Sequence, residues 1–107
     1  GLAVARRLAT DGAHVALLDL NESAGQEQAA VLGARAGFHR CDVSDEASVD
    51  AALAAAATAM GGLNVAINCA GILGAGRALG KEGPMPLAQF ERTIRVNLLG
   101  SFAVAKR

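Results

Sequence analysis

The stretch Leu-Asn-Val-Ala-Ile-Asn-Cys-Ala-Gly at residues 63–71 decides the predicted fold. Its first half is a short apolar run rich in Val and Ile, preceded by Gly61 and Gly62. Such a run is typical of a parallel strand buried on both faces of a sheet. From Asn68 to Gly71 every residue is small or polar, so the backbone at the strand's carboxyl end can lie against a flat ligand. We therefore predict a buried strand whose end contacts a ligand.

The composition indicates one α/β domain with an aliphatic core. The chain has 107 residues, and its 52% hydrophobic content contrasts with only 3% aromatic residues. Ten basic and ten acidic residues cancel, and no basic stripe points to nucleic acid or to an anionic membrane surface. The longest low-polarity run, residues 51–60, is far shorter than the roughly 20 residues of a membrane span. We expect a small-molecule partner, with neither nucleic acid nor a membrane.

The positions of the cysteines and histidines in the sequence predict neither a disulfide nor a metal site. Cys41 and Cys69 end different predicted strands, so we expect free thiols in a reducing cytoplasm. Neither the two cysteines nor the two histidines have the spacing of metal ligands. Cys69 has no evident base beside it, which favours a small packing residue over a nucleophile.

Short aliphatic strands alternate with helices along the chain. We predict strands at 15–20 and 37–40 and a third that begins at residue 63, and helices at 2–9, 21–32, 44–60 and from residue 87 onward. This alternation predicts a doubly wound parallel sheet in three αβα layers. The first residue is Gly1 and both ends have a helical pattern, so we expect a partial domain over residues 1–107, truncated at both ends.

Residues 72–86 interrupt the alternation and are predicted to be an inserted loop. The spacing of Gly74, Gly76 and Gly80 suggests a dinucleotide fingerprint, but the last glycine comes one place late. Pro84 and Pro86 also prevent the long helix that this fingerprint requires. A loop of this length is typical of a binding loop, a lid or mobile surface.

Acidic residues follow two of the predicted strands. Asp19 lies near the ~20-residue spacing after Gly1 at which a carboxylate accepts the ribose hydroxyls of a dinucleotide. It could equally begin a turn with Asn21. Asp42 could accept from the exocyclic amine of a purine, with Val43 as a flat apolar contact. Asp42 could instead be a helix-entry residue.

Asn97 is predicted to lie on the apolar face of the last helix, close to the angular position of Phe90. A carboxamide there must find hydrogen-bond partners or cost about 1 to 3 kcal/mol.

Taken together, these residues resemble the short-chain dehydrogenase/reductase family, with its Rossmann fold. The motifs are the glycine before the first helix, the acid after the second strand, the Asp-Val pair, and Asn-Cys-Ala-Gly at 68–71, followed by Val-Asn-Leu-Leu-Gly-Ser at 96–101. Cys69 departs from the second Asn of the family motif, a departure that some members share. Within the family, Leu-Asp-Leu at 18–20, Asn-Cys-Ala-Gly-Ile at 68–72 and the long insertion are most similar to the type-2 3-hydroxyacyl-CoA dehydrogenases.

The resemblance implies a site and an activity. It implies that the adenosine side of NAD contacts Gly1, Asp19, Leu20, Asp42, Val43, Cys69, Ala70 and Gly71, and that Asn97 is the asparagine of the catalytic tetrad. The family's Ser, Tyr and Lys would lie beyond Arg107, and the chain has no tyrosine, so we expect these 107 residues alone to be inactive.

The expected parent is an NAD-dependent oxidoreductase acting on a secondary alcohol such as a 3-hydroxyacyl-CoA, and family members pair as dimers or tetramers. Two alternatives are a non-catalytic nucleotide-binding or scaffolding domain of the same fold and an NADP-linked carbonyl reductase.

Overall fold

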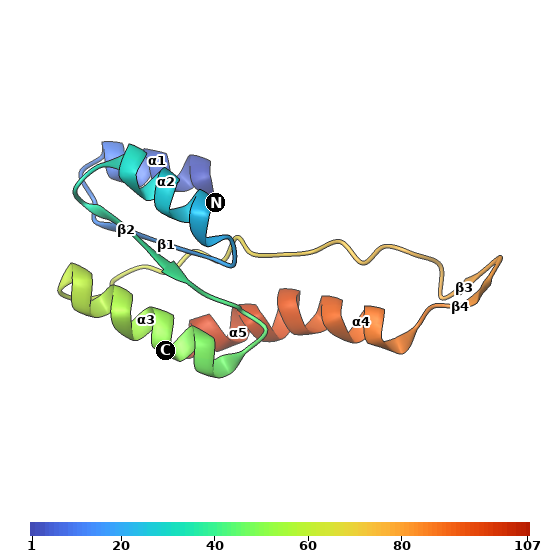
Figure 1. The fold of residues 1–107 in the computed structure, drawn as a ribbon. Helices are drawn as coiled ribbons and strands as arrows, with labels where there is room; N and C mark the ends of the chain where they lie inside the picture. The colour runs from blue at the N-terminus through green and yellow to red at the C-terminus, as the bar shows by residue number, and fades with distance from the viewer.

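The computed structural model describes all 107 residues and forms an elongated α/β structure (Figure 1). Its elements are α1 (Leu2–Thr10), β1 (Val15–Asp19), α2 (Glu22–Leu32), β2 (Ala36–Arg40), α3 (Glu46–Met60), β3 (Leu79–Gly80), β4 (Gly83–Pro84), α4 (Leu87–Ile94), the π-helix η1 (Arg95–Leu99) and α5 (Gly100–Ala105). None of the helices has both the length and the apolar character needed to cross a bilayer.

Strands β1 and β2 form a parallel pair between two layers of helices. The register joins Val15 to Ala36 at one end and Asp19 to Arg40 at the other. Helices α1 and α2 pack on one face and α3 on the other (Figure 1). Gly25 of α2 lies directly over Phe38, where an added Cβ would come 2.0 Å from the ring. The predicted α/β class and the order of its three layers are therefore confirmed for this part of the sheet.

The core is aliphatic, as the composition predicts. Its buried cluster comprises Cys41, Val49, Ala52, Leu53 and Ala103, so it joins the end of β2 to α3 and α5. Val49 is completely buried in this cluster.

Local sequence signals set the ends of the helices. The Asn21 side chain caps α2 by accepting from the amide of Ala24 at 3.1 Å. Gly33 follows this helix at φ 98°, and Gly61 ends α3 at φ 76°, conformations that residues with a Cβ rarely adopt. The predicted boundaries of both helices are confirmed to within a residue or two.

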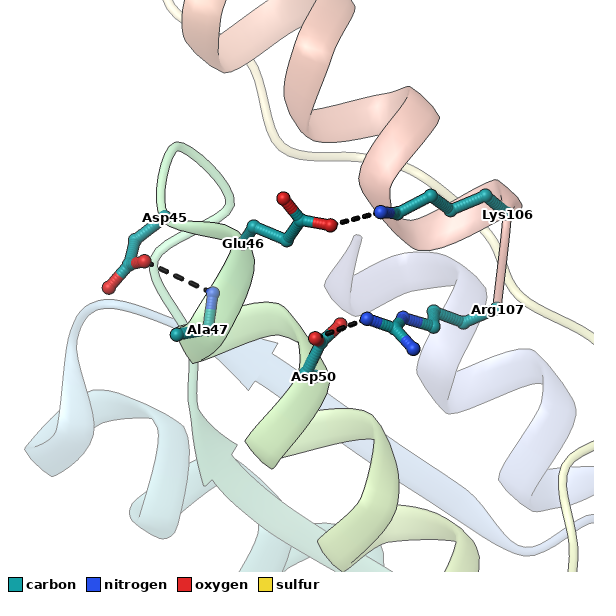
Figure 2. A network of polar contacts seen from close by, with 6 residues as sticks. All are labelled: Asp45, Glu46, Ala47, Asp50, Lys106 and Arg107. Carbon is teal, nitrogen blue, oxygen red and sulfur yellow. Dashed lines mark hydrogen bonds and ion pairs between the residues drawn. The ribbon is translucent and has the colours of Figure 1, made fainter.

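Two ion pairs connect the end of α5 to the beginning of α3. Figure 2 shows Lys106 paired with Glu46 and Arg107 paired with Asp50. Acidic side chains at a helix N-terminus and basic ones at a C-terminus also complement the helix dipoles. These pairs reinforce the packing of α5 on α3 at the edge of the core.

The strand predicted to begin at residue 63 does not form, and neither it nor the following residues to 71 adopt regular secondary structure. The segment has no regular secondary structure, and its residues are exposed, including Val65 at 67% and Ile67 at 51%. A strand needs a neighbour to satisfy its amides and carbonyls, and β1 pairs only with β2 in this chain. The prediction of a buried strand here is therefore wrong for these 107 residues, which supply no strand beside the segment.

The predicted loop at 72–86 is mostly irregular and holds one short antiparallel pair, β3 with β4. Gly74 lies against Thr93 of α4, where an added Cβ would come 2.0 Å from the hydroxyl oxygen. No helix begins directly after Gly80, because β4 and the prolines precede α4, and this agrees with the rejection of a dinucleotide fingerprint in the loop.

Because the 63–71 segment is apolar and exposed, we expect the isolated 107-residue chain to self-associate through it. Replacing Val65 and Ile67 with Lys should lower the mean mass in sedimentation velocity at micromolar concentration. Val31→Lys, at a residue that is also 67% exposed but lies on α2, should leave it unchanged. A monomeric wild-type chain with a concentration-independent melt would contradict the prediction.

Candidate functional site

Asp19 is the last residue of β1, at the carboxyl edge of the parallel pair. Its Oδ1 accepts a hydrogen bond from the amide of Asn21 at 3.0 Å, which forms a turn before α2. Its Oδ2 accepts no hydrogen bond and the residue is exposed, as is the following Leu20. The turn interpretation is therefore correct for one oxygen, while the other can still accept from a ligand.

Asp42 lies at the same edge, directly after β2. The amide of Cys41 donates to the carbonyl of Asp19 at 3.0 Å, so the chain after β2 runs beside the end of β1. Asp42 Oδ1 accepts from the Ser44 amide at 2.9 Å and from its hydroxyl at 2.6 Å. Ser48 accepts from the Asp42 amide at 2.9 Å. These contacts orient Asp42 and leave its Oδ2 without a hydrogen-bond partner.

The same contacts control the charge of Asp42. The hydrogen bonds from Ser44 lower the pKa of its carboxyl, and the positive charges of Arg40 and Arg92 lower it further. Asp42 is therefore an anion with one free oxygen at neutral pH. Of the residues that enter α3, Asp45 supplies the cap with its side chain, while Asp42 bonds to Ser44 and Ser48 in the same entry loop.

Val43 connects this edge to the C-terminal helices. It packs against the buried cluster, and Gly100 approaches it so closely that an added Cβ would lie 2.9 Å from the Val43 carbonyl oxygen. Only glycine permits this approach of α5 to the β2–α3 loop. Val43 is thus partly buried by protein, with a limited surface left for a ligand.

Gly1 and the 69–71 segment lie together. A Cβ added to Gly1 would be 3.5 Å from the Cβ of Cys69, and one added to Gly71 would be 3.5 Å from Oδ1 of Asn97. Cys69, Ala70 and Gly71 are exposed and make no regular secondary structure. Cys69 therefore contributes a small side chain beside the start of α1.

Asn97 holds the beginning of the long loop. Its Oδ1 accepts from the Ile72 amide at 2.8 Å, and its Nδ2 donates to the Ile72 carbonyl at 2.9 Å. The expectation that this carboxamide finds hydrogen-bond partners is confirmed. The last helix is not regular, however, because Asn97 lies in the π-helix η1 between α4 and α5. Such π-segments often occur at functional sites.

The structure brings most of the predicted residues into two connected groups. Asp19, Leu20 and Asp42 share the carboxyl edge, while Gly1 meets Cys69 and Gly71 meets Asn97. The stretch 97–100 contacts both Gly71 and Val43, and so links the second group to the loop after β2. A surface hollow lies elsewhere, between the C-terminal ends of α1 and α2, at the opposite edge of the strands.

Sequence reasoning missed the residues that orient these groups. Ser44 and Ser48 fix Asp42, and the hydroxyl of Ser101 donates to the Asn97 carbonyl at 2.8 Å. The Asp-x-Ser spacing at 42–44 is a signal of an Asx turn and could have indicated the first of these contacts. Nothing in the sequence indicates that Asn97 lies in a π-helix.

A sequence model described as enoyl-(acyl carrier protein) reductase, of the short-chain dehydrogenase/reductase family, matches residues 1–107. The chain belongs to this family. The expected resemblance is therefore confirmed over the whole chain.

Individual relatives agree with the family assignment. The chain is 44% identical over 108 residues to bovine 3-hydroxyacyl-CoA dehydrogenase type-2, covering 99% of this chain and 41% of that protein. It is 39% identical over 114 residues to D-threitol dehydrogenase of Mycolicibacterium smegmatis, covering 100% of this chain and 42% of the relative. This member of the short-chain family thus spans less than half the length of these relatives.

Solved structures share the fold. The 3-hydroxyacyl-CoA dehydrogenase type-2 of Mycobacterium avium superposes with a TM-score of 0.83 at 34% identity, covering 99% of this chain and 43% of that one. A complex of actinorhodin polyketide ketoreductase with NADPH superposes with a TM-score of 0.89 at 28% identity, covering 98% of this chain and 40% of that one. The packing of helices on both faces of β1 and β2 is therefore shared with these family structures.

We expect Ser44→Ala to raise the pKa of Asp42 towards its ordinary value, because two hydrogen bonds from Ser44 favour the charged carboxylate and the substitution removes the one from its hydroxyl. Because folding lowers this pKa, the ionised carboxylate stabilises the fold at pH values above the unfolded pKa of about 3.9. This stabilisation is lost as the pH falls through the lower pKa of the folded state. Carboxyl ¹³C NMR titration measures the shift. Ser23→Ala, whose hydroxyl donates to Asn21, is the matched control and should not move it.

Asn97→Leu should destabilise the fold by about 1 to 2 kcal/mol, because it removes two hydrogen bonds to the Ile72 backbone. Amide exchange at Ile72 should also become faster. Asn64→Leu, at an exposed residue that makes no side-chain hydrogen bond, is the control for both urea unfolding and exchange. Equal effects of the two substitutions would show that the Asn97 contacts contribute nothing specific.

Proposed function

We propose that the whole protein is an NAD-dependent short-chain oxidoreductase and that this chain holds the adenosine side of its cofactor site. The family's relatives are dehydrogenases and reductases, which supports the oxidoreductase class. The observation that carries the choice of NAD is the exposed Asp19 carboxylate at the carboxyl edge, with Oδ2 unused. A carboxylate there accepts the two ribose hydroxyls of NAD and repels the 2′-phosphate of NADP.

The surrounding residues fit a dinucleotide. Asp42 presents one free oxygen that can accept from the adenine amine, and the partly exposed Val43 provides an apolar contact. Gly1 begins α1 with no side chain, so its backbone can approach the pyrophosphate at the helix N-terminus. Cys69, Ala70 and Gly71 are small and lie beside Gly1, which leaves room for the cofactor along the backbone. Leu20 is exposed next to Asp19 and can cover the ribose.

Bound NAD supplies the hydride acceptor, and the substrate is a secondary alcohol. The type-2 3-hydroxyacyl-CoA dehydrogenases among the relatives support a 3-hydroxyacyl-CoA or a similar hydroxy compound as the substrate.

Asn97 is proposed to hold a water molecule for proton relay. Its side chain is already bonded to Ile72, so its main chain in η1 is the better candidate for that water contact.

Pairing of the whole protein as a dimer or tetramer is proposed through α4 and α5. Leu87, Phe90 and Phe102 are more than half exposed along these helices. An apolar helix face of this kind is typical of a subunit interface.

A cytoplasmic location is proposed from the free thiols of both cysteines.

An NADP-linked carbonyl reductase is the second candidate. It is favoured by the ketoreductase whose structure contains NADPH and resembles this chain with a TM-score of 0.89. The two candidates differ in their binding of the 2′-phosphate. A non-catalytic nucleotide-binding domain would bind a cofactor but show no turnover.

Asp19→Arg in the whole protein should shift the kcat/KM ratio from NAD towards NADP by at least about tenfold, because it exchanges repulsion of the 2′-phosphate for a charge-assisted contact. Initial rates with both cofactors measure the shift. Glu27→Arg, the same charge change on the exposed surface of α2, is the control and should leave the ratio unchanged. NADP used by the wild type as well as NAD, or no shift in the variant, would contradict the proposal.

A further inference from the structure

Within the β1–β2 pair, Arg40 is the positively charged residue nearest to Asp19. It is the last residue of β2, and the parallel register pairs its Cα with that of Asp19, the last residue of β1. Paired residues of neighbouring parallel strands project to the same face of the sheet. The carboxylate of Asp19 and the guanidinium of Arg40 therefore project from neighbouring strands, at the edge where the adenosine is proposed to bind.

The packing shows which face these side chains occupy. Phe38 lies under Gly25 of α2, whereas Leu18 packs against the buried cluster on the side of α3. Because side chains alternate along a strand, Arg40 projects to the same face as Phe38. Asp19 is one residue beyond Leu18 and projects to that face too. Cys41, one residue beyond Arg40, is in the buried cluster on the opposite face, as the alternation requires.

The guanidinium of Arg40 is available to a ligand. The residue is exposed, and it takes part in none of the ion pairs or side-chain hydrogen bonds of the structure. Its positive charge also helps to lower the pKa of Asp42, two residues further along the chain. Arg40 thus has Asp19 as its register partner and Asp42 two residues further along, and it is bonded to neither carboxylate.

We propose that Arg40 is a specificity-determining residue that can bind the 2′-phosphate of NADP and that Asp19 opposes this binding in the wild type. The inference rests on the proposed function, because it requires the adenosine ribose at this edge. A guanidinium binds phosphate through paired hydrogen bonds, which makes Arg suited to this role. With Asp19 charged, repulsion of the 2′-phosphate opposes that attraction. With Asp19 neutral, Arg40 is the cation that remains beside the 2′-position.

The proposal distinguishes two ways of gaining NADP affinity. Asp19→Arg brings a new cation, but Asp19→Asn only removes a negative charge and preserves the side-chain shape. If Arg40 binds the phosphate, Asp19→Asn should tighten NADP binding by at least about tenfold. That gain should disappear in the double variant with Arg40→Gln, whereas NAD binding by the two variants should agree within about twofold.

The test measures the Kd of NAD and NADP by calorimetry for the whole protein and its variants. Lys81→Gln in the Asp19→Asn background is the matched control, since Lys81 lies in the β3–β4 turn far from the edge (Figure 1) and its loss should leave the gain intact. Arg40→Lys keeps the charge without the paired hydrogen bonds, and should retain only part of the gain. This variant also decides the outcome if Arg40→Gln does not fold, as circular dichroism would reveal.

The outcomes separate this inference from the proposed function. Loss of the gain with Arg40→Gln, but not with Lys81→Gln, supports it. An undiminished gain in the Arg40 variants, or no gain in Asp19→Asn while NAD still binds, overturns the role of Arg40 and leaves the NAD site standing. Binding of neither cofactor by the wild type overturns the proposed function and this inference with it.

Discussion

The parallel pairing of β1 with β2 is the constraint on which the rest of this structure depends. Its register brings Asp19 and Arg40 to one edge and places Asp42 immediately beyond them. The helices follow from it, because each strand face needs apolar cover, supplied by α1 and α2 on one side and α3 on the other. The polar residues gather at the carboxyl edge because both strands run in the same direction and end there.

A second constraint is the close approach of α5 to the loop after β2. Gly100 allows the helix backbone to contact Val43, and the ion pairs of Lys106 and Arg107 with α3 reinforce the same approach. Asn97 is only three residues before Gly100, so the docking of α5 also fixes the position of the Asn97 carboxamide. This carboxamide bonds to the backbone of Ile72. The packing of α5 on the loop after β2 therefore also sets the position of the loop that begins at Ile72.

Each acidic residue has a structural role that leaves room for its proposed contact with a ligand. One oxygen of Asp19 closes the turn to Asn21, and one oxygen of Asp42 accepts two hydrogen bonds from Ser44. These local bonds orient each carboxylate and leave its second oxygen for a ligand. At Asp19, the turn to Asn21 and the proposed contact with a ligand are therefore compatible. Preorganisation of this kind lowers the entropy cost of binding.

The sequence by itself determined the helices, the two paired strands and the family, because caps, stop glycines and apolar periodicity act within a few residues. Asn21, Asp45, Gly33 and Gly61 are such local signals. Tertiary structure alone decided that residues 63–71 form no strand, since pairing depends on a neighbour elsewhere in the chain. It also decided the π-helical setting of Asn97 and the placing of Arg40 beside Asp19, because both arise from contacts between segments distant in sequence.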